Sequence, residues 1–172
     1  MGIAFVVDPP LTEDLRERLV ALWVDVTNAG GAVGFVAPVG PEAVRPVAEA
    51  ALQGVTDGPD RMVAGFDGDE LIAVLFVVDN RFALKRHWRV LKRVMVTPKS
   101  QGRGYGAALM RAAEALGRDM GLEALQVTVR GGLGIEGFYE RLGYREVGRI
   151  PGALRLAPGD DRDETYMWLG LV

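Results

Sequence analysis

The stretch VMVTPKSQGRGYGAALMRAAEALG, residues 94–117, runs from a strand-like apolar triplet through three glycines into an amphipathic helix. Gly102, Gly104 and Gly106 occupy alternate positions where the helix begins. Glycine has no Cβ, so such a loop can present several backbone N–H groups to one ligand, and a helix N-terminus favours negative charge. The pattern predicts a strand, a phosphate-binding loop and a helix in direct succession.

The composition is that of an ordinary globular protein: 172 residues, 49% hydrophobic, 25% charged, with a net charge of −3. We expect one domain, residues 1–172, because this length suits one core better than two. The mild acidity argues against nucleic acid as a partner. Cysteine is absent, which excludes disulfides, thiolate metal sites and a cysteine nucleophile. No metal is expected.

The N-terminal segment MGIAFVVDPP has an apolar run but no basic segment before it and no small-residue cleavage site after it. No apolar run in the chain approaches the ~20 residues that a helix needs to span a bilayer. We therefore expect a cytoplasmic protein without a membrane partner.

Local patterns predict a strand and two helices over residues 3–54, with Thr12 as the N-cap of the first helix. Asp67-Gly68 marks a hairpin turn, and a third strand ends at Pro98. A helix at 105–120, a strand at 124–130, a short helix at 135–143 and two final strands follow. An antiparallel first half with a βαβ unit in the second predicts an α+β fold around one central sheet.

Two nucleotide-binding patterns compete for the glycine loop. Gly102-x-Gly104-x-x-Ala107 satisfies the dinucleotide motif, but that motif follows the first strand of a βαβ unit and needs an acid at the end of the next strand. Here the loop follows three antiparallel strands, and the next strand ends in Val129-Arg130. The Walker pattern fails because no Gly-Lys-Ser or Gly-Lys-Thr follows. The sequence therefore argues against NAD-dependent redox chemistry and against phosphoryl transfer.

A third pattern fits better. QGRGYG, residues 101–106, set after the strand VMV, resembles the pyrophosphate loop of the Gcn5-related N-acetyltransferases (GNAT family), which bind acetyl-coenzyme A (acetyl-CoA). GFYERLGY, residues 137–144, resembles that family's FYxxxGF segment. The C-terminal tail is similar to small-molecule enzymes of the tabtoxin-resistance type. The resemblance implies a mixed, mostly antiparallel sheet flanked by helices on both faces. We expect a monomer or homodimer.

The resemblance also implies where the coenzyme binds. Loop amides would hold the pyrophosphate, and the preceding strand would pair with the pantetheine arm where it splays from the strand at 126–130. The expected cofactor-binding residues are Val94, Met95, Val96, Gln101, Gly102, Arg103, Gly104, Tyr105, Gly106 and Ala107.

The expected chemistry is direct acetyl transfer to a primary amine, because the only serine, Ser100, lies in the phosphate loop and an acyl-serine is improbable. Tyr139 matches the tyrosine of the family's FY segment, so the resemblance implies that it is the general acid. A phenol of pKa near 10 stays protonated at neutral pH and can hydrogen-bond the departing sulfur. The oxyanion donor would be the backbone N–H of Val96 or Met95.

The general base is open. Many relatives carry an acid on the strand before the loop, whereas RVLKRVMV has only basic charged residues. Glu136, one helical turn before Tyr139, and His87, whose ordinary pKa suits a base, are the candidates, with Asp79 and a water chain as alternatives. Gly132 stands where relatives often have a coenzyme-binding asparagine.

The acceptor would be a small-molecule amine bound by the glycine-rich loop NAGGAVGFVAPVG, residues 28–40, which we expect to act as a lid. The candidate substrate-binding residues are Phe35, Tyr166 and Trp168. Because the strand lacks an acid and Gly132 replaces the asparagine, a second hypothesis is a GNAT-like module that binds acyl-coenzyme A with little transferase activity.

Overall fold

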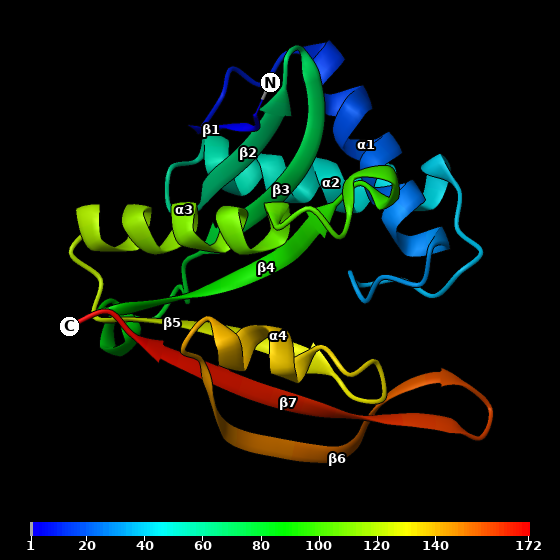
Figure 1. Ribbon diagram of the computed structural model, residues 1–172, viewed down its shortest axis with the longest axis vertical. Coiled ribbons are helices and arrows are strands. Elements are labelled where there is room, and N and C mark those ends of the chain that lie inside the picture. Colours follow the sequence, from blue (N-terminus) through cyan, green and yellow to red (C-terminus); the bar gives the residue numbers. More distant parts are fainter. Residues whose placement is uncertain (1) are drawn as a thin grey trace.

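The computed structural model describes residues 2–172 and shows one seven-stranded sheet in the order β1-β2-β3-β4-β5-β7-β6 (Figure 1). Only β4 and β5 pair in parallel; the other neighbours are antiparallel. The strands are β1 (Ala4–Val7), β2 (Arg61–Asp67), β3 (Glu70–Val78), β4 (Trp88–Val96), β5 (Ala124–Arg130), β6 (Arg145–Ala157) and β7 (Asp160–Gly170).

Helices cover both faces of the sheet. The sheet separates α1 (Glu13–Asn28) and α2 (Pro41–Thr56) from α3 (Tyr105–Asp119) and α4 (Glu136–Arg141) (Figure 1). Short 3-10 turns occupy Ala83–Lys85 and Pro98–Ser100. No helix within residues 2–172 is both long and apolar enough to cross a membrane.

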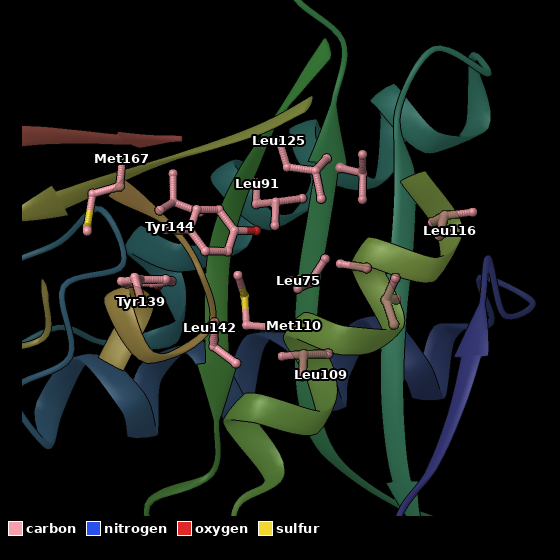
Figure 2. Close-up of a cluster of buried hydrophobic side chains, with 14 of the residues drawn as sticks. Leu75, Leu91, Leu109, Met110, Leu116, Leu125, Tyr139, Leu142, Tyr144 and Met167 are labelled. Atoms are coloured by element: carbon pink, nitrogen blue, oxygen red, sulfur yellow. The ribbon is translucent and has the colours of Figure 1, made fainter. Parts of the chain in front are cut away.

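Two buried clusters form the core, one on each face. Strand β3 contributes to both, because alternate side chains point to opposite faces of a sheet: Leu75 packs under α3, and Phe76 packs under α1 and α2. Figure 2 shows the first cluster, in which Leu91, Met110 and Tyr144 lie together. The apolar run of β3 thus reflects burial on both sides.

The predicted order of strands and helices and the α+β fold class are confirmed. Thr12 caps α1 as expected, since its hydroxyl accepts a hydrogen bond of 3.1 Å from the Leu15 N–H. Gly68 has a φ of +58° in the hairpin turn between β2 and β3, a conformation that favours glycine. The hairpin β6–β7 is longer than the sequence predicts, because β6 continues to Ala157 and β7 begins at Asp160, where a loop was expected.

Candidate active site

The two central strands separate part-way along their length. β4 and β5 pair in parallel from Trp88–Ala124 to Leu91–Val127, and the pairing ends there. Both strands continue, β4 to Val96 and β5 to Arg130. Their facing backbone groups are therefore not paired with each other beyond Leu91, and the sheet opens between them.

A β-bulge lies at the start of this opening. Phe76 of β3 pairs with Lys92 and Val74 pairs with Met95, so a single β3 residue, Leu75, faces both Arg93 and Val94. Arg93 has a φ of +57°, in the left-handed region that non-glycine residues rarely adopt. Such bulges bend a strand and redirect its side chains. Here the bulge turns β4 away from β5 and sends the Arg93 side chain towards Trp23 of α1, with 5.5 Å between the guanidinium and the indole ring centroid.

The glycine loop ends at the N-terminus of α3, with its amides free. Gly102 and Gly104 have φ values of +78° and +80°, and a Cβ on either would meet nothing within 4 Å. The first helical bond runs from the Ala108 N–H to the Gly104 carbonyl at 3.0 Å. Within residues 2–172, no N–H from residues 102–107 donates to a protein acceptor. The loop therefore fits an anion such as a pyrophosphate.

One cavity of about 1010 Å³ joins this loop to the opposite face of the sheet. On the α3 and α4 side its walls include Val94, Val96, Phe138 and Tyr139. On the α1 and α2 side they come from residues 29–34 of the glycine-rich loop, from β5 and from β7. A thioester held in the opening between β4 and β5 would be reachable from both sides.

The sequence of this cavity region matches a known enzyme family. The acetyltransferase (GNAT) family matches residues 33–144, which contain the bulge, the glycine loop and α4. The chain belongs to the GNAT family. It is thus an enzyme of a family of acetyl-CoA-dependent N-acetyltransferases. No curated protein sequence matches the chain.

Solved structures share this GNAT fold at low identity. An N-acetyltransferase from Staphylococcus aureus Mu50 has a TM-score of 0.82 at 9% identity, with all of both chains covered. An aminoglycoside 6'-N-acetyltransferase complexed with coenzyme A has a TM-score of 0.76 at 16% identity, covering 100% of this chain and 98% of its own. The protein yncA from Salmonella typhimurium, solved with acetyl-CoA, has a TM-score of 0.75 at 15% identity, covering 100% and 95%.

Most of the expected cofactor residues line the cavity of this GNAT enzyme: Val94, Val96, Gln101, Gly102, Gly104, Tyr105, Gly106 and Ala107. Two do not. Met95 is buried in the core between the sheet and α1, and Arg103 is exposed beside the loop. The Gln101 side chain donates to the Val96 carbonyl at 3.0 Å, which ties the loop to the end of β4.

Tyr139 is the one of the three predicted catalytic residues that lines the cavity. Burial raises the pKa of Tyr139 to about 12, so the phenol stays protonated across the physiological range. Glu136 lies on the same short helix outside the cavity lining. His87 is exposed before the start of β4, whereas the bulge is near that strand's other end.

Of the three predicted acceptor residues, only Tyr166 lines the cavity. Phe35 packs its ring edge-on against Trp23, with centroids 6.2 Å apart. Trp168 packs on Trp88, with centroids 5.1 Å apart, where β4 is still paired with β5.

The loop expected to be a lid is held in place by hydrogen bonds. The Trp23 indole donates to the Val33 carbonyl at 2.9 Å. The Asn28 side chain accepts from the Val39 N–H at 2.9 Å and donates to the Val39 carbonyl at 3.0 Å. In this structure the loop forms one wall of the cavity, and its expected action as a lid stays a prediction.

Gly132, the position where relatives often have asparagine, has a φ of +86°, and a Cβ there would collide with the Arg162 guanidinium. Arg162 also donates to the Gly131 carbonyl at 3.2 Å. An arginine from β7 therefore occupies the space beside this turn. Nothing in the sequence near residue 132 indicates that neighbour, because the two are joined only by the pairing of β5 with β7.

Charged residues that the sequence analysis did not assign to the site also line the cavity: Lys92, Arg93, Arg130 and Glu164. Glu164 is the only acid in that lining among residues 2–172, and its carboxylate accepts a hydrogen bond of 3.1 Å from the Tyr166 hydroxyl. In the sequence it belongs to an acidic run that resembles a solvated turn. The sequence signal that could have placed Glu164 in the site is its spacing of two residues from Tyr166, a predicted site residue, since residues i and i+2 of a strand share a face.

Proposed function

We propose that the protein transfers the acetyl group of acetyl-CoA directly to the primary amine of a small molecule while both substrates are bound. The observation that carries this proposal is the single cavity that joins the glycine loop on one face of the sheet to the charged residues on the other. Acetyl-CoA supplies the thioester carbonyl that the amine attacks. The nitrogen forms the new amide bond as the carbon–sulfur bond breaks.

Within this proposal the chain's residues hold the thioester and move two protons. Free amides of residues 102–107 bind the pyrophosphate, and the unpaired edge of β4 holds the pantetheine arm. Tyr139 donates to the departing sulfur. Glu164, the acid in the cavity lining, accepts the proton that the amine loses.

The proposal of a small acceptor rests on the size and walls of the cavity. Ligand pockets for small molecules commonly measure ~300–1000 Å³. This cavity of about 1010 Å³ must hold the pantetheine end as well as the acceptor. Its far side is lined by the anchored loop and by Leu154 of β6. We therefore expect an acceptor about the size of an amino acid.

Finer expectations from the sequence belong to the same proposal and rest on sequence alone. They are a tabtoxin-resistance-type specificity, a cytoplasmic location, a single domain over residues 1–172 and a monomeric or homodimeric state.

Two-substrate kinetics test the proposal. Thiol release is measured over a panel of primary amines at several acetyl-CoA concentrations. Direct transfer in a ternary complex gives intersecting double-reciprocal lines, whereas an acyl-enzyme gives parallel lines. Parallel lines would refute direct transfer. Tight acetyl-CoA binding by calorimetry without thiol release on any amine would favour the binding module instead.

A further inference from the structure

We infer that the acceptor amine also carries a carboxylate, which Arg93 and Arg130 bind on the α1 and α2 side of the cavity. This inference rests on the proposed function and adds the chemical class of its acceptor. Its starting point is the charge of the cavity wall, where Lys92, Arg93 and Arg130 face a single acid, Glu164, among residues 2–172. The whole chain, in contrast, has a net charge of −3.

Arg93 is a partly buried cation without an acidic partner. Most arginines of the chain form ion pairs with nearby carboxylates, for example Arg81 with Asp60 at 2.8 Å. The Arg93 side chain makes no ion pair or hydrogen bond within residues 2–172 and packs instead over the Trp23 ring. Burial lowers its pKa from the ordinary value. A buried guanidinium without a partner loses hydration, and an incoming anion would restore its hydrogen bonds.

Arg130 brings a second guanidinium to the same loop. Its Nη2 donates to the Phe35 carbonyl at 3.3 Å, while a Cβ on the adjacent Gly34 would collide with the Arg93 guanidinium. The two arginines therefore meet at neighbouring residues of one anchored loop. Burial lowers the pKa of Arg130 and the nearby Arg162 lowers it further, whereas Asp160, which forms an ion pair with Arg162, raises it.

The acid in the cavity wall, Glu164, forms no ion pair with either arginine. Arg130 and Glu164 are direct partners in the antiparallel register of β5 and β7, yet their charged groups form no ion pair. Glu164 accepts from the Tyr166 hydroxyl instead. The wall thus offers two cations and, separately, one carboxylate, which is the arrangement that a molecule with an acid and an amine requires. The planar fork of arginine suits a carboxylate.

Matched pairs of acceptors test the inference through turnover. Each pair is an amino acid and the amine that remains without its carboxylate: L-leucine with 3-methylbutylamine, L-methionine with 3-methylthiopropylamine, and L-phenylalanine with 2-phenylethylamine. We expect at least one amino acid to exceed its amine in kcat/KM by about 10- to 100-fold, as expected for a hydrogen bond to a charged group. Amines that react as well as their amino acids would overturn the inference and leave the proposed function standing.

Three variants assign the preference to the arginines. Arg93→Met should raise KM for the favoured amino acid about 10- to 100-fold, leave KM for its amine unchanged and leave acetyl-CoA affinity unchanged. Arg93→Lys should retain part of the preference because it keeps the charge. Arg86→Met removes an exposed cation outside the cavity and should change nothing. If Arg93→Met does not fold, Arg130→Met tests the same contact. A preference that survives in both arginine variants would overturn the assignment.

A binding measurement keeps the inference separate from catalysis. Calorimetry compares N-acetyl-L-leucine with N-(3-methylbutyl)acetamide on the wild-type protein saturated with coenzyme A. Tighter binding of the carboxylate compound, lost in Arg93→Met, would support the inference even if no amine released thiol. Equal or undetectable binding of both compounds, together with no carboxylate preference in turnover, would overturn it.

Discussion

The rings of Tyr139 and Tyr144 meet edge to face, with centroids 5.8 Å apart, yet the two phenols have different surroundings. Tyr139 lines the cavity. Tyr144 is enclosed in the core near Leu91 and Met110 (Figure 2), and its hydroxyl is buried without a hydrogen-bond partner among residues 2–172. Two tyrosines of one aromatic cluster thus have different expected roles, and each serves as the control for the other.

We expect Tyr139→Phe to lower kcat by ~10²-fold or more while leaving acetyl-CoA affinity near the wild-type value, because it removes the proposed general acid and keeps the ring. The measurement is steady-state kinetics with calorimetric binding of acetyl-CoA. Tyr144→Phe, the matched control, should leave kcat within about twofold. Equal losses in both variants would indicate damage to the aromatic cluster and not loss of an acid.

Tyr144→Phe should stabilise the protein by about 1 kcal/mol, because it removes a buried hydroxyl that has no partner. The free energy of unfolding in urea, measured for wild type and variant at pH 7, checks this. A destabilised variant would show that the hydroxyl makes a hydrogen bond in solution, for example to a buried water.

The raised pKa of Tyr139 predicts a loss of stability at alkaline pH. A tyrosine titrates near pH 10 when unfolded and at about 12 in the native protein, so the unfolded state loses its proton first. Below pH 10 this group adds no pH dependence. Between pH 10 and 12 the free energy of unfolding should fall by about 1.4 kcal/mol per pH unit, or about 2.7 kcal/mol in all.

Burial also raises the pKa of Tyr144, and the negative charge of Glu114 raises it further, so this residue acts in the same direction. Urea unfolding from pH 9 to 11.5 should therefore show a smaller alkaline slope in Tyr139→Phe than in wild type. Identical slopes in the two proteins would mean that Tyr139 titrates normally in the native state.

Glu164→Gln distinguishes the candidate bases. We expect kcat to fall about 10²-fold at neutral pH if this carboxylate takes the amine's proton. Glu136→Gln and His87→Gln should remain within about twofold, because neither residue lines the cavity. Full activity of Glu164→Gln across pH 6 to 9 would point to proton transfer through water instead.

Gly104→Ala should weaken acetyl-CoA binding by at least about tenfold, because a methyl group would enter the open space where we propose that the pyrophosphate binds. Gly159→Ala is the matched control. Both glycines have a φ of +80° and open space at the Cβ position, so both variants carry a similar backbone strain of about 1–2 kcal/mol. Calorimetry should show normal affinity for Gly159→Ala. Equal weakening in the two variants would assign the effect to strain.

The sequence by itself determined the parts of this protein that short-range physics controls. Alternation of apolar residues and turn signals predicted the order of strands and helices, and Thr12 predicted the start of α1. The glycines at 102, 104 and 106 predicted a loop with free amides at the N-terminus of α3. Each depends on residues within about one turn of one another, so its cause is visible in a local stretch.

Only the tertiary structure decided which side chains share the cavity. The bulge at Arg93 depends on the register of β4 against β3, and Glu164 reaches the site because β7 pairs with β5 across more than thirty residues of chain. Such pairings bring distant residues together without leaving a local pattern, and a shift of one residue would send every side chain to the other face. The charged wall of the cavity, on which the inferred class of acceptor rests, follows from that register.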